Sequence, residues 1–357
     1  MLDESFVIDG VAHAYNFDIS NNVLPASTEL FAEMTYKQHL LYSPRDPGRY
    51  LQTKDEFLQS CKPEWVAHAL FSESPVDMAV YHAVPLYDFF KDGLSSLEKG
   101  VEMKQRWPDR VLLYGTCNPL EGRVALEKID EQLSSFNIDG VKLYPAVYYA
   151  GRSIGWRMDD RDVAYPLFEH MLELGITNVA VHKAIPLGPS DVDTFHVDDI
   201  VPAARQFPEL NFQIVHGGIA FLEETMMLIR RFPNVYLNLE STVSYAASRP
   251  RVFAEILGSA LYYGSAEQLI FATGCNLVHP RPILQALWDF EMPQDLIDGY
   301  GYSPVTLETK QKIVGLNLAR LHGIDVERAT KAIADDEFSN LESVGFSHPW
   351  GRLRGEY

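Results

Sequence analysis

The chain has 357 residues, with 49 acidic and 30 basic side chains, so its formal net charge is −19. This charge excludes nucleic acids and anionic membranes as partners, because both are polyanions and no run of Lys or Arg provides a local exception. The apolar fraction of 46% is large enough for a sizeable core, so the acidity is a property of the surface and not a sign of disorder.

The cysteines and the N-terminal residues indicate the compartment. Cys61, Cys117 and Cys275 are too few and too widely spaced for a disulfide framework or a C-x-x-C metal motif, which favours a reducing environment. The first ten residues are acidic and lack the apolar region of a signal peptide. No stretch approaches the roughly 20 apolar residues that span a bilayer. We therefore expect a cytoplasmic protein.

Short apolar runs alternate with segments of helical periodicity along the chain. Near-continuous apolar strands that alternate with helices are typical of a parallel sheet buried on both faces. Eight such units predict a (β/α)8 barrel, the TIM-barrel fold, within the α/β class. The alternative, an open doubly wound sheet, would require a glycine-rich loop after the first strand, and residues 10–13 do not form one. The predicted strands are 6–9, 76–84, 110–117, 140–144, 178–182, 212–216, 235–240 and 269–273, and the clearest helices are 123–136, 161–174, 219–231 and 281–290.

Two segments depart from this alternation. Residues 14–75 form a long first connection that is rich in aromatic residues, and we expect it to cap the mouth of the barrel. Residues 290–357 include two predicted helices, at 305–320 and 324–335, that should pack outside the barrel. No linker or repeat divides the chain, so we expect a single domain over 1–357. The tail helices and apolar cap residues such as Phe71 and Phe89 could support a homodimer.

Polar residues at the predicted strand ends are the candidates for function, because the chemistry of such barrels lies at the carboxyl ends of the strands. His13, His182 and His216 follow three apolar strands, and imidazole is a good ligand for Zn²⁺. Each histidine alone is more often a hydrogen-bonded core residue, but the three together predict a mononuclear metal site. The other candidates at or near strand ends are His82, Lys142, Tyr144, Arg152, Glu240, Cys275 and Asn276.

Several segments in this order resemble a known family. They are VIDGVAH at 7–13, GVKLYP at 140–145, NVAVHKA at 178–184, FPELNFQIVHGG at 207–218, FPNVYLNLE at 232–240, LIFATGC at 269–275 and KIVGLNLARLHGID at 312–325. The chain resembles the amidohydrolase superfamily, in the amidohydrolase-related branch of aminocarboxymuconate-semialdehyde decarboxylase, the resorcylate-type decarboxylases and pyrone-dicarboxylate lactonase. The resemblance runs over nearly the whole chain.

The ligand pattern that the resemblance implies is incomplete. His13 matches the second ligand of the first strand, and His182 and His216 match the ligands of strands 5 and 6. Val11 stands where the family has its first ligand, and Gly274 stands where an Asp normally binds metal and moves protons. The remaining histidines could hold one divalent metal, most readily Zn²⁺ and alternatively Mn²⁺, with a water whose pKa is lowered toward about 7.

These residues lead to three hypotheses. The first is a metal-dependent hydrolase that activates water at the three-His site, with Glu240 as the base and Cys275 as a thiolate ligand or nucleophile. The second is a decarboxylase of an aromatic or unsaturated acid. The third is a barrel that works without metal, or one that binds a small molecule without catalysis. In each, the ligand is a small carboxylate-bearing or aromatic molecule, held by Lys142, Tyr144, Arg152, His82 and Asn276.

Overall fold

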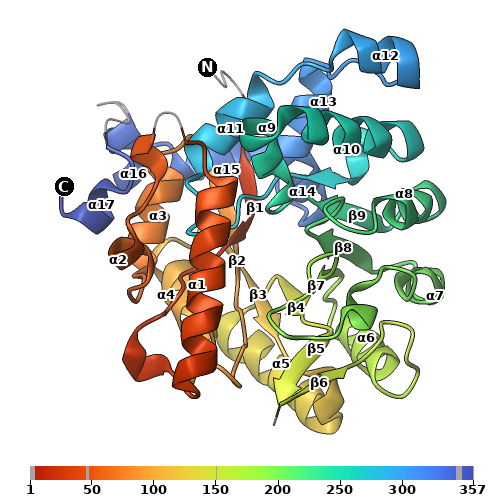
Figure 1. The fold of residues 1–357 in the computed structure, drawn as a ribbon. Coiled ribbons are helices and arrows are strands. Elements are labelled where there is room, and N and C mark those ends of the chain that lie inside the picture. Colours follow the sequence, from red (N-terminus) through yellow and green to blue (C-terminus); the bar gives the residue numbers. More distant parts are fainter. Residues whose placement is uncertain (1–4, 46–47, 150, 343–347, 357) are drawn as a thin grey trace.

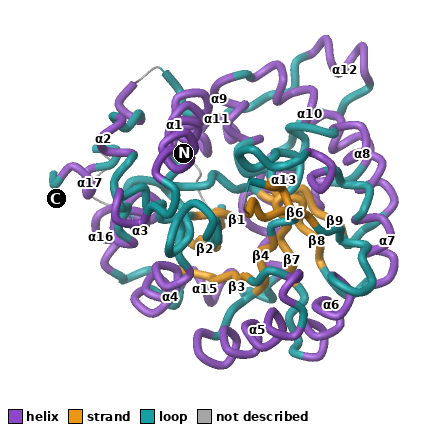
Figure 2. Tube along the Cα trace, turned by 60° about the horizontal axis from the view of Figure 1, so that its bottom comes forward, coloured by secondary structure: helices purple, strands orange, loops and turns teal. Residues whose placement is uncertain are grey.

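The computed structural model describes residues 5–45, 48–149, 151–342 and 348–356. Eight parallel strands follow one another in a single sheet, and the first and last also meet. Ala12 and Cys275 form a parallel bridge, and the amide of Gly10 donates to the carbonyl of Phe271 at 2.9 Å. The sheet therefore closes on itself, and the predicted barrel is confirmed (Figure 1, Figure 2). In sheet order the strands are β1 (Ile8–Ala12), β2 (Met78–His82), β3 (Val111–Thr116), β4 (Gly140–Leu143), β7 (Asn178–His182), β8 (Asn211–Val215), β9 (Val235–Asn238) and β10 (Leu269–Ile270).

Helices surround this barrel and connect its strands (Figure 1). A short antiparallel hairpin, β5 (Ala146–Tyr149) with β6 (Arg152–Gly155), follows β4. The helices in the connections between strands are α4 (Leu97–Arg106), α5 (Arg123–Phe136), α6 (Ala164–Glu173), α7 (Ile200–Gln206), α8 (Leu222–Arg231), α9 (Tyr245–Ser248) and α10 (Pro250–Tyr263). After β10 come α11 (Pro280–Trp288), α12 (Gln294–Tyr300), α13 (Leu307–Gln311), α14 (Asn317–Leu321), α15 (Val326–Ile333), α16 (Glu337–Glu342) and α17 (Gly351–Arg354).

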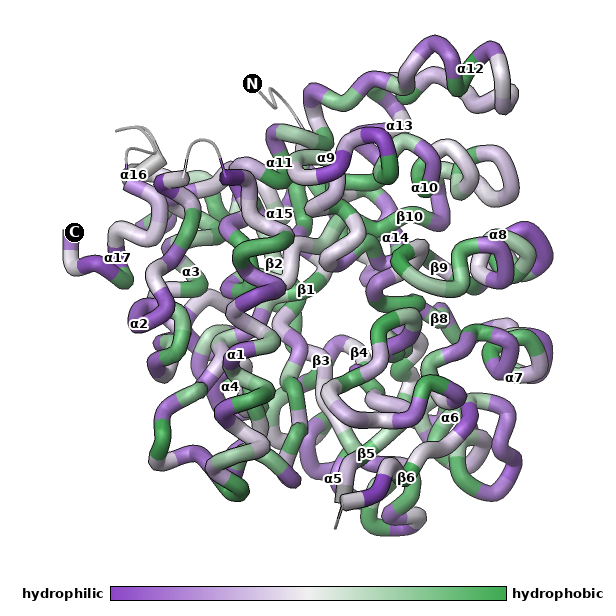
Figure 3. Tube along the Cα trace, in the orientation of Figure 1, coloured by the Kyte–Doolittle hydropathy of each residue, from purple (hydrophilic) through white to green (hydrophobic). Residues whose placement is uncertain are grey.

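The sequence pattern explains why these helices cover the barrel. In α8 the buried side chains are Thr225, Met226, Leu228 and Ile229, which form one stripe toward the strands. Its first turn carries two glutamates and its last turn two arginines, an arrangement that complements the helix dipole. Figure 3 shows hydrophilic stretches along the outer helices α7 and α8, as expected for helices with one face toward solvent.

The first connection contains three helices, α1 (Pro25–Tyr42), α2 (Lys54–Phe57) and α3 (Pro63–Phe71). Helix α1 reaches the mouth of the barrel, where Phe31, Thr35 and Gln38 line a pocket. It is anchored in part by Thr28, whose hydroxyl donates to the carbonyl of Phe89 at 2.9 Å. The cap predicted within residues 14–75 is therefore present, and α1 is the part of it that faces the pocket.

The C-terminal helices pack against the outside of the barrel, as predicted. A π-helical turn at Lys312–Leu316 joins α13 to α14. The carbonyl of Ile313 accepts from the amide of Phe271 at 2.9 Å, and the side-chain amide of Asn317 donates to the carbonyl of Leu269 at 2.7 Å. Because the amide of Phe271 bonds to Ile313 and not to β9, β10 pairs with β9 over two residues only and is shorter than the predicted 269–273.

Two aromatic residues of the cap region are internal. Phe71 and Phe89 are buried inside the chain, so neither offers an apolar surface for a homodimer. Within the described ranges, no helix combines the length and the apolar character that crossing a bilayer requires.

Candidate active site

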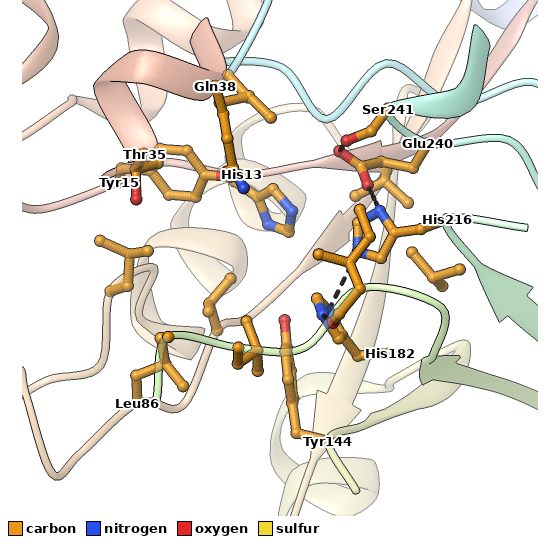
Figure 4. A pocket seen from close by; sticks show the side chains of 18 of the residues that line it. His13, Tyr15, Thr35, Gln38, Leu86, Tyr144, His182, His216, Glu240 and Ser241 are labelled. Atoms are coloured by element: carbon orange, nitrogen blue, oxygen red, sulfur yellow. Dashed lines mark hydrogen bonds and ion pairs between the residues drawn. The ribbon is translucent and has the colours of Figure 1, made fainter. Parts of the chain in front are cut away.

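A pocket lies at the carboxyl ends of the barrel strands, between them and α1 (Figure 4). Apolar side chains, among them Val11 and Leu277, form part of its wall. A larger cavity of about 660 Å³ adjoins it, and the two share Phe31, Leu86, Tyr144 and Leu187. The polar side chains that line the inner pocket are His13, Tyr15, Thr35, Gln38, Lys142, Tyr144, His182, His216, Glu240 and Ser241.

His182 and His216 meet in this pocket with their ring planes inclined by 72°. His182 ends β7, His216 directly follows the neighbouring strand β8, and their ring centroids are 4.4 Å apart. Nε2 of His182 lies 2.8 Å from the carbonyl oxygen of Ile185 and must donate, because a carbonyl only accepts. Nδ1 of a neutral His182 then carries a lone pair, and it faces Nε2 of His216 at 3.1 Å.

Glu240 fixes the other side of the His216 ring. This glutamate follows β9, is 2% exposed, and places Oε2 in direct contact with Nδ1 of His216. Its Oε1 accepts from the hydroxyl of Ser241 at 2.9 Å. Burial disfavours the charged carboxylate, but His216, His13 and the Ser241 hydroxyl together outweigh that effect, so the pKa of Glu240 lies below its ordinary value. The three side chains therefore form one chain of contacts, from Glu240 through His216 to His182.

His13 lies across the pocket from this chain of contacts (Figure 4). Its Nδ1 donates to the carbonyl of His82 at 2.8 Å, and its ring stacks on Tyr15 with the centroids 5.2 Å apart. Burial lowers the pKa of His13 to about 4. Burial, and then His216, hold the pKa of His182 well below its ordinary range. Both rings are therefore neutral at pH 7, which is the form in which imidazole binds a metal.

The donor set fits a metal ion in part. His13, His182 and His216 each have one ring nitrogen next to an oxygen acceptor, which is the arrangement that orients metal-binding histidines. Zn²⁺ contacts imidazole nitrogen at about 2.0–2.1 Å. Two nitrogens 3.1 Å apart can thus reach one ion. In the described part of the chain, however, no three His, Cys, Asp or Glu side chains are gathered closely enough to form a metal centre.

Lys142 and Tyr144 extend the site from β4. Lys142 is 1% exposed, and its ammonium lies 5.1 Å from the centroid of the Tyr144 ring. Burial lowers its pKa to about 7, although the charge of Glu240 acts in the opposite direction. Tyr144 stacks on His182 with the centroids 5.2 Å apart. The pocket therefore joins a buried amine, an aromatic wall and the carboxylate–imidazole contacts.

Four residues that the sequence nominated do not line this pocket. Cys275 is fully buried, and burial raises the pKa of its thiol well above the usual range. Asn276 accepts from the amide of Tyr15 at 3.2 Å. The ring of His82 stacks on Tyr114, and Arg152 is exposed on the β6 hairpin. The structure thus gathers six of the nominated side chains, His13, Lys142, Tyr144, His182, His216 and Glu240.

Thr35 and Gln38 line the pocket but were not nominated from the sequence. They lie on α1 together with Phe31 and Met34, at the three- and four-residue spacing of one helix face. That spacing was readable in the sequence. The sequence did not indicate that this face of the helix points toward the strand ends.

Comparisons with known proteins agree with this fold. The chain is similar to an uncharacterised TIM-barrel protein from Bordetella bronchiseptica, with 18% identity, a TM-score of 0.60, and coverage of 89% of this chain and 98% of that one. It is also similar to 5-carboxyvanillate decarboxylase LigW from Sphingomonas paucimobilis, with 15% identity, a TM-score of 0.52, and coverage of 90% and 100%. A third similar structure is 5-carboxyvanillate decarboxylase LigW2 from Novosphingobium aromaticivorans, crystallised with bound manganese, with 12% identity, a TM-score of 0.57, and coverage of 90% and 97%.

A search of curated proteins finds no match to the chain. The model of one protein family, described as Amidohydrolase, matches residues 68–324. That match includes every strand of the barrel except β1, and with it His182, His216 and Glu240. Because it spans well over half of the sequence, the chain belongs to the amidohydrolase family.

Proposed function

We propose that this protein is a metal-dependent hydrolase, which adds water to an amide, ester or lactone bond of a small carboxylate-bearing or aromatic substrate. The observation that carries the proposal is the chain of contacts from Glu240 through His216 to His182 at the carboxyl ends of β7, β8 and β9. A carboxylate that holds one imidazole nitrogen and orients the other into a pocket is a common feature of both metal sites and general-base sites.

The close pair His182 and His216 supports a divalent cation in this pocket, and His13 across the pocket is the candidate third ligand. Oxygen acceptors take one ring nitrogen of each, so Nε2 of His13, Nδ1 of His182 and Nε2 of His216 are the nitrogens left for a ligand. With His216 donating to Glu240, two lone pairs would face each other at 3.1 Å, which requires a second proton or a cation between them. Zn²⁺ is our first choice and Mn²⁺ the second; either would supply Lewis acidity to polarise a carbonyl.

Glu240 is the proposed proton acceptor. Of the described residues that line the inner pocket, it is the only carboxylate. Its Oε2 contacts Nδ1 of His216, so this carboxylate is the base that lies beside the ring whose Nε2 would hold the cation. The hydroxyl of Ser241 holds Oε1 and keeps the carboxylate in this orientation.

The environment of Lys142 favours a substrate that carries an anionic group. Among the described residues its ammonium makes no hydrogen bond or ion pair, and it lies 5.1 Å from the centroid of the Tyr144 ring. A buried amine that faces a pocket without a partner favours a carboxylate ligand, because the pair would satisfy both charges. The adjoining cavity offers room for the rest of such a molecule.

The experiment combines metal analysis with turnover of a substrate panel. The purified protein, supplied with Zn²⁺ or Mn²⁺, is assayed on lactones, esters and amides of aromatic and unsaturated acids. We expect Glu240→Gln to lower kcat at least about a hundredfold, as loss of a general base does. The matched control is Glu224→Gln, since Glu224 contacts His196 at 3.3 Å on the exterior and should leave kcat unchanged.

Three outcomes would count against the proposal. Full turnover in Glu240→Gln would remove this residue as the base. Failure of both ions to bind or to stabilise the fold would remove the metal. Release of CO₂ from hydroxybenzoates or muconates, without hydrolysis of any panel member, would replace the hydrolase by a decarboxylase.

A further inference from the structure

We propose that Gly274 is a positioning residue for Glu240, because its missing side chain leaves the space that the Glu240 carboxylate occupies. The inference deepens the proposed function, in which Glu240 accepts the proton. It also identifies how a carboxylate from the end of β9 comes to lie beside the end of β10.

The backbone leading to Glu240 is tied to the last strand. The amide of Leu239 donates to the carbonyl of Ile270 at 2.8 Å, and the amide of Thr242 donates to the carbonyl of Glu240 at 2.6 Å. Ser241 has a φ of 58°, a left-handed conformation that non-glycine residues rarely adopt. The chain therefore turns sharply after Glu240, and the side chain extends toward the end of β10.

The position of Gly274 shows what that side chain meets. A Cβ atom at residue 274 would lie 2.2 Å from Oε1 of Glu240, 3.0 Å from its Cδ and 3.2 Å from its Cγ. These three nearest atoms all belong to one side chain. Ser241 holds Oε1 and His216 holds Oε2, so a shift of the carboxylate away from residue 274 would disturb these contacts. We infer that a side chain at 274 would move the carboxylate out of this orientation.

The backbone conformation of Gly274 is a competing reason for glycine. Its φ is +72°, and its amide donates to the carbonyl of Val11 at 2.9 Å. The chain offers a matched control for this effect. Gly175 has a φ of +75°, yet a Cβ atom there would meet nothing within 4 Å. Gly175→Ala therefore measures the cost of the left-handed conformation alone.

A double-mutant cycle separates the two reasons. Gly274→Ala is made in the wild-type and in the Glu240→Ala background, and unfolding equilibrium constants are measured in urea. We expect Gly274→Ala to raise the unfolding constant at least tenfold more in the wild-type background than in Glu240→Ala, where its effect should match that of Gly175→Ala. A Gly274→Ala protein that folds only without the Glu240 carboxylate is the extreme form of this result. Equal effects in the two backgrounds would overturn the inference.

Kinetics test the positioning role itself. In the hydrolase assay, Gly274→Ala should lower kcat about as much as Glu240→Ala does, with KM changed less than threefold, and should cause no further loss in the Glu240→Ala background. Gly175→Ala should leave kcat unchanged. If Gly274→Ala retained wild-type kcat, the inference would be wrong even with Glu240 as the base. If no hydrolysis occurred in any protein, the proposed function would fail, while the unfolding cycle would still decide whether the two residues share this space.

Discussion

The two sides of the barrel mouth differ sharply. On the side of β7, β8 and β9, the strand ends carry His182, His216 and Glu240, which contact one another and line the pocket. On the side of β10 and β1, Gly274 and Val11 offer no ligand, and His13 after β1 is the imidazole that lines the pocket there. One side therefore holds a contiguous carboxylate–imidazole group, and the other holds a single histidine beside open space and an apolar wall.

Asp9 shows why a charged strand residue need not join the site. Its carboxylate accepts from the amide of Thr273 at 2.9 Å and from the amide of Val11 at 3.2 Å, and it also contacts the hydroxyl of Thr273. Burial raises its pKa to about 7. These bonds tie β1 to the segment after β10. Whether a strand-end carboxylate is structural or chemical is thus decided by its hydrogen-bond partners.

The largest expected effect is the loss of His216, the ring that connects Glu240 to His182 on the side of β7, β8 and β9, which we call the reactive side. His216→Asn removes the ring that contacts both Glu240 and His182, so we expect kcat to fall at least about a thousandfold and metal affinity to fall with it. Turnover and metal content by elemental analysis measure this. His196→Asn is the control, since that ring contacts Glu224 outside the pocket. A His216→Asn protein with normal metal content and turnover would show that the chemistry does not depend on the side of β7, β8 and β9.

A second prediction concerns Lys183, which follows His182 on the reactive side but has a different role. Its ammonium lies 2.7 Å from Asp199, and both side chains are almost completely buried. Lys183→Met leaves that carboxylate buried and unpaired, so we expect a loss of about 3 kcal/mol in unfolding free energy.

Urea denaturation checks the Lys183 prediction, and activity per folded molecule should stay unchanged. Adding Asp199→Leu to Lys183→Met should recover part of the lost stability, because it removes the unpaired charge. A stable Lys183→Met protein with low turnover would instead place Lys183 in the chemistry.

The sequence predicted the barrel well because that fold depends on local patterns. The helical periodicity of 123–136 coincides with α5 (Arg123–Phe136), and the apolar run 178–182 coincides with β7. The three histidines and Glu240 could also be nominated, since parallel strands bring their carboxyl ends to one face.

Side-chain partners were less predictable, because they depend on contacts between distant segments. The direction of Asp9 is fixed by Thr273, 264 residues further along the chain. The packing of Glu240 against Gly274 likewise requires the register of β9 against β10 and a left-handed turn at Ser241. No local pattern contains that information. The sequence shows that residue 274 has no side chain, but it does not show that the Glu240 side chain occupies the space beside it.

A third prediction tests the charge of Lys142, which lies between the two sides. Its folded-state pKa of about 7 lies below the unfolded value of 10.5. Between these values the unfolded chain binds a proton that the folded chain lacks, so the Lys142 contribution makes unfolding free energy rise with pH, by at most about 1.4 kcal/mol per pH unit.

Comparison with Lys142→Met at pH 7 and pH 9.5 isolates this slope. The wild type should gain stability relative to the variant as the pH rises. Lys331→Met, at an exposed position, serves as the control and should give no such difference. Identical pH slopes for the wild type and Lys142→Met would show that Lys142 stays charged in the folded protein.

The smallest expected effect belongs to Cys275, which follows Gly274 on the β10 side of the mouth. Its thiol is fully buried and is absent from the pocket wall, and burial raises its pKa well above the usual range. A thiol becomes a nucleophile or a metal ligand as the thiolate, which this environment disfavours. Cys275→Ala should therefore keep kcat and metal content within about twofold of the wild type, and a thiol reagent should label this residue only after unfolding. Loss of metal in Cys275→Ala, or rapid labelling of the folded protein, would mean that the segment after β10 contributes a reactive thiolate. The difference proposed between the two sides of the barrel mouth would then be wrong.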